Sequence, residues 1–189
     1  MIELAAVFWF LVALFGVIGL MRGWVREIQV TAGAVLAMFI IEQISPWVWT
    51  VLVERTSAEL LATDPLGTLR RLVMLKAAIL LIVVFFGYQG PMIMQLAGSK
   101  SRGSRARENI QEGALGLIVG LVNGYLVIGA LWWYVHVAQY PFDWIVSPLA
   151  APDSPSAALI SALPLRYLAS PWLEILVVIF FLIVLVAVI

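Results

Sequence analysis

Long apolar runs separated by short polar stretches dominate the chain. The most informative run covers residues 113–137, which contain no charged side chain and exceed the roughly 20 residues that a helix needs to cross a bilayer. Other long apolar runs cover residues 2–21, 28–45, 72–96 and 171–189. Runs of this length are typical of transmembrane helices. We therefore expect an all-α, polytopic membrane helical bundle with a four-helix core and a fifth, C-terminal spanning helix.

Glycines recur on one side of the run at 113–137. On a helical wheel they form one narrow stripe, which consists of Gly113, Gly116, Gly120 and Gly124. Glycine weakens a helix in water, but in lipid a stripe without side chains lets a second backbone approach closely. Asn123 borders the stripe, where its amide is placed to hydrogen-bond a neighbouring helix. We expect helix packing here and at a second small-residue pair, Gly19 and Gly23.

The opposite side of the same run carries Tyr125, Gly129, Trp132 and His136. If the glycine stripe packs inside the bundle, this side faces lipid, a pigment or another subunit. Two interpretations of His136 stay open. One is a polar residue in the aromatic belt at the membrane boundary. The other is an axial ligand of a haem or chlorophyll-type macrocycle, because imidazole suits both.

The polar stretch after the first run contains Arg22, Trp24 and Arg26. The two arginines are four residues apart, which would place them on one helical face. One interpretation is a basic turn that sets topology, with Trp24 as an interfacial anchor. The other is that the arginines bind lipid phosphate or a partner's carboxylate. A denser basic loop at 98–107 is expected to be flexible and cytoplasmic, which puts the N-terminus outside and the C-terminus in the cytoplasm.

Composition divides the chain into three parts. Residues 1–137 form the predicted core, within which the mixed segment 46–65 is expected to lie along the membrane interface. Residues 138–170 contain five prolines and few charges, which indicates an ordered extracytoplasmic cap with a short surface helix at 156–163. Residues 171–189 form the predicted C-terminal span.

Prolines and glycines also predict where the helices are interrupted. We expect Pro46 to stop the second helix and Pro91 to kink the third. The stretch at 64–67 combines aspartate, proline and glycine, which is typical of a turn.

Composition and charge exclude several classes of protein. The chain is 63% apolar and only 12% charged, about half the charge of a soluble domain. The net charge is zero, so nothing indicates a nucleic-acid partner. There is no cysteine, one histidine and no phosphate-binding glycine loop. We therefore expect no catalytic residue, no metal site and no enzymatic activity. Because Glu3 stands where a signal peptide has basic residues, the first run is expected to stay in the mature protein.

Two segments resemble the colicin V production protein (CvpA) family of bacterial membrane proteins. One is Gly19-x-x-Arg-Gly-x-x-Arg-Glu27, and the other is the glycine-rich segment 113–124. The similarity in order and spacing covers about residues 3–137, and it implies a four-helix inner-membrane core without established enzymatic chemistry, in a family named for a need in toxin export. The family often has Asp-Arg before the glycine helix and a basic residue near its third glycine, where this chain has Arg107-Glu108 and Asn123.

These observations favour a non-enzymatic accessory or scaffolding subunit of a larger bacterial membrane complex, with a photosynthetic or respiratory complex as one candidate host. Membrane lipids and other membrane protein subunits are the expected partners. The alternative is a component of export, transport or membrane-integrity machinery. Asn123 is nearly the only polar group expected at mid-bilayer, which counts against autonomous transport. A third hypothesis is a cofactor-binding subunit that uses His136; otherwise no cofactor is expected.

Overall fold

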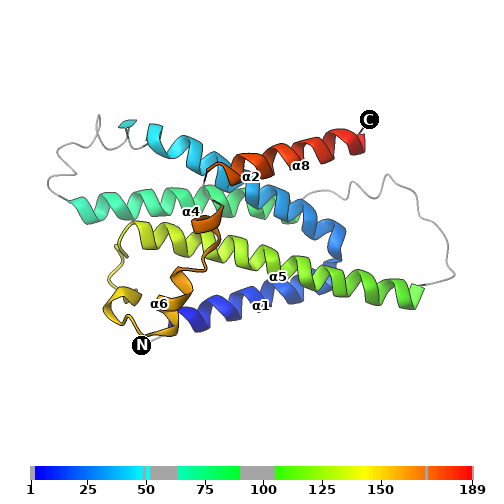
Figure 1. Ribbon diagram of the computed structural model, residues 1–189, viewed down its shortest axis with the longest axis horizontal. Coiled ribbons are helices and arrows are strands. Elements are labelled where there is room, and N and C mark those ends of the chain that lie inside the picture. The colour runs from blue at the N-terminus through cyan, green and yellow to red at the C-terminus, as the bar shows by residue number, and fades with distance from the viewer. Residues whose placement is uncertain (1–2, 49, 52–63, 90–104, 169, 189) are drawn as a thin grey trace.

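The structure is a computed structural model that describes residues 3–48, 50–51, 64–89, 105–168 and 170–188. The long helices are Leu4–Arg22 (α1), Trp24–Val48 (α2), Pro65–Gln89 (α4), Arg105–Val137 (α5) and Trp172–Val188 (α8). The short ones are the 3-10 helix Pro148–Ala150 (η3), Pro155–Ile160 (α6) and Pro164–Tyr167 (α7). Within these residues there is no strand (Figure 1), which confirms the predicted all-helical architecture.

Three helices among the described residues are long and apolar enough to cross a membrane: α1, Trp24–Trp47 of α2 and Ile110–Val137 of α5. A fourth candidate joins Pro155–Tyr167 to Trp172–Phe180, a pair bent by 55° that would form one broken span or a re-entrant loop. The described part of the chain therefore has three or four candidate spans, and the five expected from the sequence are not all found.

Two helices have boundaries that the sequence did not predict. The second begins at Trp24 instead of residue 28, and Pro46 lies inside its last turn instead of stopping it. The helix beginning at Pro65 includes the predicted turn at 64–67. Asp64 caps it, because its carboxylate accepts a hydrogen bond from the Gly67 N–H at 2.8 Å; proline fits the first position because a helix leaves that N–H without a partner.

The glycine-rich helix also starts earlier than expected. Because α5 begins at Arg105, the end of the predicted basic loop belongs to the helix, which is about 50 Å long at 1.5 Å per residue. Residues 52–63 of the expected interfacial segment, the kink expected at Pro91 and residues 98–104 of the basic loop lie outside the described residues.

Helices α1 and α5 lie antiparallel with their backbones in contact, as the pairing of Leu20 with Gly113 and of Val12 with Gly124 shows. An added Cβ at Gly120 would lie 2.5 Å from the Phe15 carbonyl oxygen, and one at Gly124 would lie 2.9 Å from the Val12 Cα. Real Cβ atoms do not approach backbone atoms so closely. The glycine stripe therefore lies against α1.

Gly19 and Gly116 form the tightest point of this contact. A Cβ on either residue would collide with the carbonyl oxygen of the other. Gly23 differs from Gly19, because a Cβ there would meet nothing within 4 Å. Gly23 instead has a φ of 82°, a backbone conformation that favours glycine, and it ends α1.

Helix α2 packs against α4, α5 and α8 (Figure 1). The interface is a layer of side chains with at most 8% of their surface exposed. Its members from α2, α4 and α5 are Val30, Ala34, Val35, Ala37, Met38, Ile41, Leu80, Val84, Leu126, Val127, Ala130 and Tyr134. This layer fixes the position of α2 and α4 relative to α5.

The proline-rich segment folds back onto α1 and α5. Ser156 in α6 accepts a hydrogen bond from the Ala5 N–H at 3.0 Å, at the start of α1, where Glu3 provides no side-chain cap. Tyr125 in α5 donates to the Ala162 carbonyl. The expected surface helix is Pro155–Ile160, and its Ser156 and Ile160 are buried. The segment is therefore held to the bundle by buried contacts.

We predict that Gly120→Ala destabilises the protein, because the new methyl group would meet the backbone of α1. Overpacking of this kind costs about 1–3 kcal/mol. Gly33→Ala is the matched control, since a Cβ at Gly33 has no neighbour closer than 3.9 Å. Thermal unfolding in one mild detergent should show a lower midpoint for Gly120→Ala and an unchanged or higher midpoint for Gly33→Ala. Equal midpoints for the two variants would contradict the packing described for α1 and α5.

Candidate functional site

The break at Gly23 places two charged residues next to each other. The Gly23 N–H donates to the Gly19 carbonyl at 2.9 Å and closes α1, and α2 begins one residue later. Arg22 is thus the last residue of α1, and Glu27 lies in the first turn of α2. Because the helix is interrupted between them, Arg22 and Arg26 belong to different helices and do not share one helical face as the sequence predicted.

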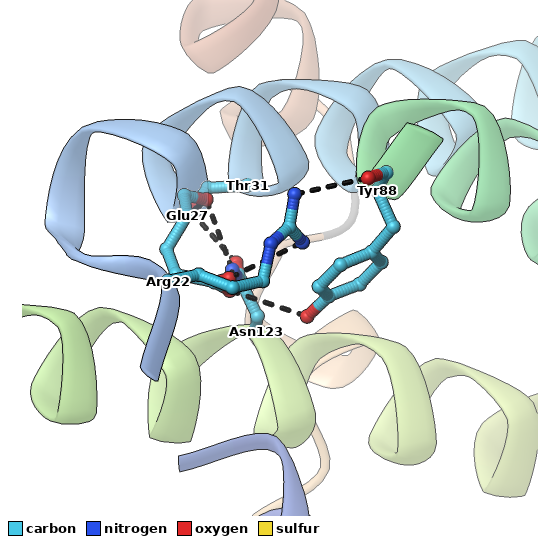
Figure 2. A network of polar contacts seen from close by, with 5 residues as sticks. All are labelled: Arg22, Glu27, Thr31, Tyr88 and Asn123. Atoms are coloured by element: carbon cyan, nitrogen blue, oxygen red, sulfur yellow. Dashed lines mark hydrogen bonds and ion pairs between the residues drawn. The ribbon is translucent and has the colours of Figure 1, made fainter. Parts of the chain in front are cut away.

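Glu27 is completely buried, with 0% of its surface exposed. The side-chain amide of Asn123 donates to its Oε2 at 2.9 Å and to its backbone carbonyl at 2.9 Å. The Tyr88 hydroxyl donates to the same Oε2 at 3.2 Å. Figure 2 shows that these donors approach the carboxylate from α5 and α4. Two helices therefore provide the hydrogen bonds that a buried carboxylate requires.

Arg22 contacts Glu27 from α1, in addition to the donors from α4 and α5. Its Nη1 lies 3.4 Å from Glu27 Oε1, longer than the roughly 2.7–2.9 Å of a well-formed charged hydrogen bond. Neither of these two atoms has a hydrogen-bond partner among the described residues. Its Nη2 donates to the Tyr88 carbonyl at 3.0 Å, and the guanidinium carbon lies 4.3 Å from the centre of the Tyr88 ring. Arg22 therefore contacts both α2 and the end of α4.

Thr31 completes the group one turn along α2. Its hydroxyl lies 2.6 Å from Asn123 Oδ1 and 3.0 Å from the Glu27 carbonyl oxygen. With its amide nitrogen bonded to Glu27 and its oxygen bonded to Thr31, Asn123 is held in one orientation. Arg22, Glu27, Thr31, Tyr88 and Asn123 form a network that joins α1, α2, α4 and α5 (Figure 2).

Sequence reasoning identified only part of this network. Asn123 was expected to hydrogen-bond a neighbouring helix, and the structure places it against α2. Arg22 was expected to meet lipid phosphate or a partner's carboxylate, but the carboxylate beside it is Glu27 of the same chain. Thr31 and Tyr88 were missed. A weak signal was available for Glu27: it is an acidic residue directly after the break at Gly23, between two apolar runs.

Trp24 and Arg26 lie close to Glu27 in the sequence. Trp24 is exposed in the first turn of α2, whereas Arg26 is partly buried. An aromatic ring at a helix end fits the predicted interfacial anchor. A contact of either residue with lipid or with a partner stays a prediction.

His136 lies apart from the network, near the C-terminal end of α5. Its Nδ1 is 3.2 Å from the Tyr140 hydroxyl, which also accepts a hydrogen bond from Trp132 Nε1 at 3.2 Å. Burial raises the pKa of Tyr140, while the bond from Trp132 acts in the opposite direction. The Tyr140 hydroxyl can donate to Nδ1 or accept from it, depending on which nitrogen of His136 carries the proton.

Other parts of the chain contact Tyr125, Gly129 and Trp132, so these residues do not face lipid, a pigment or another subunit as expected, whereas His136 on the same side is only partly buried. Gly129 lies directly against Pro164 of α7, and Tyr125 donates to Ala162. Phe8 of α1 stacks edge-on against Tyr125 and Trp132. The prediction failed because the absence of a side chain at Gly129 admits a proline that is distant in the sequence.

The described residues contain no group of three or more His, Cys, Asp or Glu side chains that could hold a metal ion. The network described above instead combines one acid, one base and three neutral hydrogen-bonding side chains. Such a set can hold or release a proton and can tie helices together.

Apolar helices of spanning length around a buried ion pair define a multi-pass helical membrane protein. The family model described as Colicin V production protein matches residues 4–157, so the chain belongs to the colicin V production protein family. The match confirms the resemblance found in the sequence and extends past residue 137 into the proline-rich segment. No curated protein and no solved structure matches the chain.

We predict that the buried pair is more sensitive to losing one partner than to losing both. Glu27→Leu leaves Arg22 without its carboxylate and should cost about 3–5 kcal/mol of unfolding free energy. The double variant Arg22→Met, Glu27→Leu leaves neither charge and should be more stable than Glu27→Leu alone. Reversible unfolding in lipid–detergent mixtures measures both values.

Glu42→Leu provides the control, because Glu42 is an exposed glutamate on the same helix. Its unfolding free energy should stay close to that of the unmodified protein. If Glu27→Leu has no larger effect than Glu42→Leu, the burial of Glu27 is wrong.

Proposed function

We propose that this chain is a non-enzymatic, multi-pass component of bacterial export or membrane-integrity machinery that works as a subunit of a larger inner-membrane assembly. The observation that carries the proposal is the buried pair of Arg22 and Glu27 inside an apolar bundle. The description of its family, which names colicin V production, gives the proposal its direction.

The buried charges are not needed to hold α1 against α5. That contact already rests on the glycine stripe, where backbones touch directly. Replacing a buried ion pair by apolar side chains often leaves stability unchanged or improves it, so its presence is weak evidence for a stabilising role. Ionisable residues inside membrane helices usually serve a function. This reasoning favours a working site at Glu27.

Membership of the colicin V production family favours export or envelope machinery over a photosynthetic or respiratory host. The accessory role expected from the sequence is retained in the proposal as a non-catalytic subunit of that machinery. A cofactor-binding role for His136 has no comparable support, since its Nδ1 is engaged with the Tyr140 hydroxyl within the chain.

The proposal includes five spans, with α4 and α8 added to the three candidates. Residues 72–89 of α4 carry a single charge, Lys76, which can extend toward the headgroups. The turn between α1 and α2 and the start of α5 lie at the same end of the bundle (Figure 1). The turn and the start of α5 both carry arginines, so by the positive-inside rule we expect this end of the bundle to lie in the cytoplasm.

We expect the chain to migrate in a particle much larger than its 20.8 kDa when it is extracted gently from its native membrane. Affinity purification followed by mass spectrometry should recover membrane proteins of export or envelope maintenance. Arg22→Ala should weaken this recovery, whereas Glu42→Gln should not. If the chain migrates only with copies of itself, or the variants behave alike, the proposed role is contradicted.

The proposed orientation can be tested by thiol labelling, because the chain has no cysteine. We predict that Asp153→Cys reacts with a membrane-impermeant maleimide in spheroplasts, since Asp153 is exposed in the proline-rich segment. Gln89→Cys, at the exposed end of α4, should react only after the membrane is opened. The reverse pattern would place the N-terminus in the cytoplasm.

A further inference from the structure

We propose that Glu27 is a proton-binding site, and that its protonation releases the end of α4 from the turn between α1 and α2. The inference rests on the site used for the proposed function. It does not depend on which assembly the chain joins, because it concerns a movement within this chain.

The geometry around the carboxylate is uneven. Oε2 accepts two hydrogen bonds, from Asn123 and Tyr88. Oε1 accepts none and lies 3.4 Å from Arg22 Nη1, which is also without a hydrogen bond. The charged form of Glu27 is therefore stabilised by two donors and by a cation in loose contact, and one oxygen remains available to a proton.

Arg22 is held by α4 as well as by Glu27. The Tyr88 carbonyl lies in the last turn of α4, where carbonyl groups lack helical partners, and it accepts a bond from Nη2. The guanidinium also lies over the Tyr88 ring. Tyr88 is thus linked to Glu27 through its own hydroxyl and through Arg22.

Protonation of the carboxylate would weaken both links at once. A neutral acid no longer attracts Arg22, and it accepts a weaker hydrogen bond from the Tyr88 hydroxyl. No bond other than the O–H on Glu27 forms, and the proton comes from water. Arg22 from α1, Tyr88 from α4 and Asn123 from α5 contact the carboxylate, and Arg26 is the second cationic residue beside Glu27, directly before it in the sequence.

The two sides of Glu27 differ in exposure. Beyond Thr31, the interface between α2, α4 and α5 contains fully buried apolar side chains, among them Ala34, Met38, Leu80 and Val127. The same buried cluster also includes Tyr134. In contrast, the Arg22 side chain is 21% exposed at the end of the bundle. We therefore expect a proton to approach Glu27 from the side of Arg22.

The sign of the pH effect follows from these contacts. Docking of α4 is favoured while Glu27 is charged, and it is lost as the pH falls and the carboxylate takes up a proton. Tyr88→Phe removes a donor to the charged form but keeps the ring under Arg22. This variant should therefore undock at a higher pH than the unmodified protein.

The test uses the full chain in lipid nanodiscs with nitroxide labels at Met21→Cys and Gln89→Cys, both exposed and next to Arg22 and Tyr88. Without natural cysteines, only these sites are labelled. Pulsed electron paramagnetic resonance measures the distance between labels across the pH range in which carboxylates titrate. We expect longer distances at low pH and a reversible transition.

Glu27→Gln, which mimics the neutral acid, should give the long distances at every pH. Glu42→Gln should titrate like the unmodified protein, and Tyr88→Phe should shift the midpoint to higher pH. Distances that do not change with pH, or a Glu27→Gln variant that titrates normally, would overturn the proposal. If Glu27→Gln does not fold, a Tyr88→Phe midpoint equal to that of the unmodified protein would overturn it.

The distance measurement tests the proton site and the purification tests the proposed function, so each can fail while the other succeeds. A chain that undocks with pH but recovers no envelope partner would retain the proton site and lose the proposed function. The opposite result would retain the function without the proton site.

Discussion

The backbone contact between α1 and α5 is the constraint from which the rest of the bundle follows. Gly19, Gly116 and Gly120 bring the two helices so close that no side chain fits between them. Because the helices are antiparallel, the end of α1 comes to lie beside the middle of α5. Gly23 then ends α1 with a backbone conformation that favours glycine, and α2 begins against Asn123. The position of Glu27 is therefore set by glycines rather than by charge.

The polar network has a different physical character from this contact. Van der Waals packing between small residues is well suited to lipid, where no hydrophobic force draws helices together. A buried carboxylate, by contrast, requires partners, and here they come from three other helices. The glycine contact holds α1 against α5 independently of the buried carboxylate, and the network adds polar contacts between the end of α4 and the start of α2.

The sequence allowed the all-helical class, the family and the glycine stripe to be predicted. Long apolar runs indicate membrane helices, and the glycine spacing and the two motif segments can be read directly from the sequence. It did not allow the helix starts at Trp24, Pro65 and Arg105 to be predicted, since hydropathy assigns polar residues to loops even where a cap or a helical partner holds them. Tyr88 and Thr31 were missed for a related reason. Nothing local distinguishes a membrane tyrosine or threonine that meets a carboxylate from one that faces lipid. The contact of Gly129 with Pro164 could not be predicted either, because no periodicity connects Pro164 to α5.

Cysteine cross-linking between α1 and α5 tests this account most directly. Leu20 and Gly113 face each other, with an added Cβ at Gly113 lying 3.3 Å from the Leu20 side chain. Mild oxidation of the Leu20→Cys, Gly113→Cys variant in native membranes should form an intramolecular disulfide and protect both thiols from a maleimide mass tag. In the Leu14→Cys, Gly113→Cys variant, position 14 lies about 9 Å from position 20 toward the start of α1, so this variant should remain fully tagged. Equal tagging of the two variants would mean that the glycine stripe does not lie against α1.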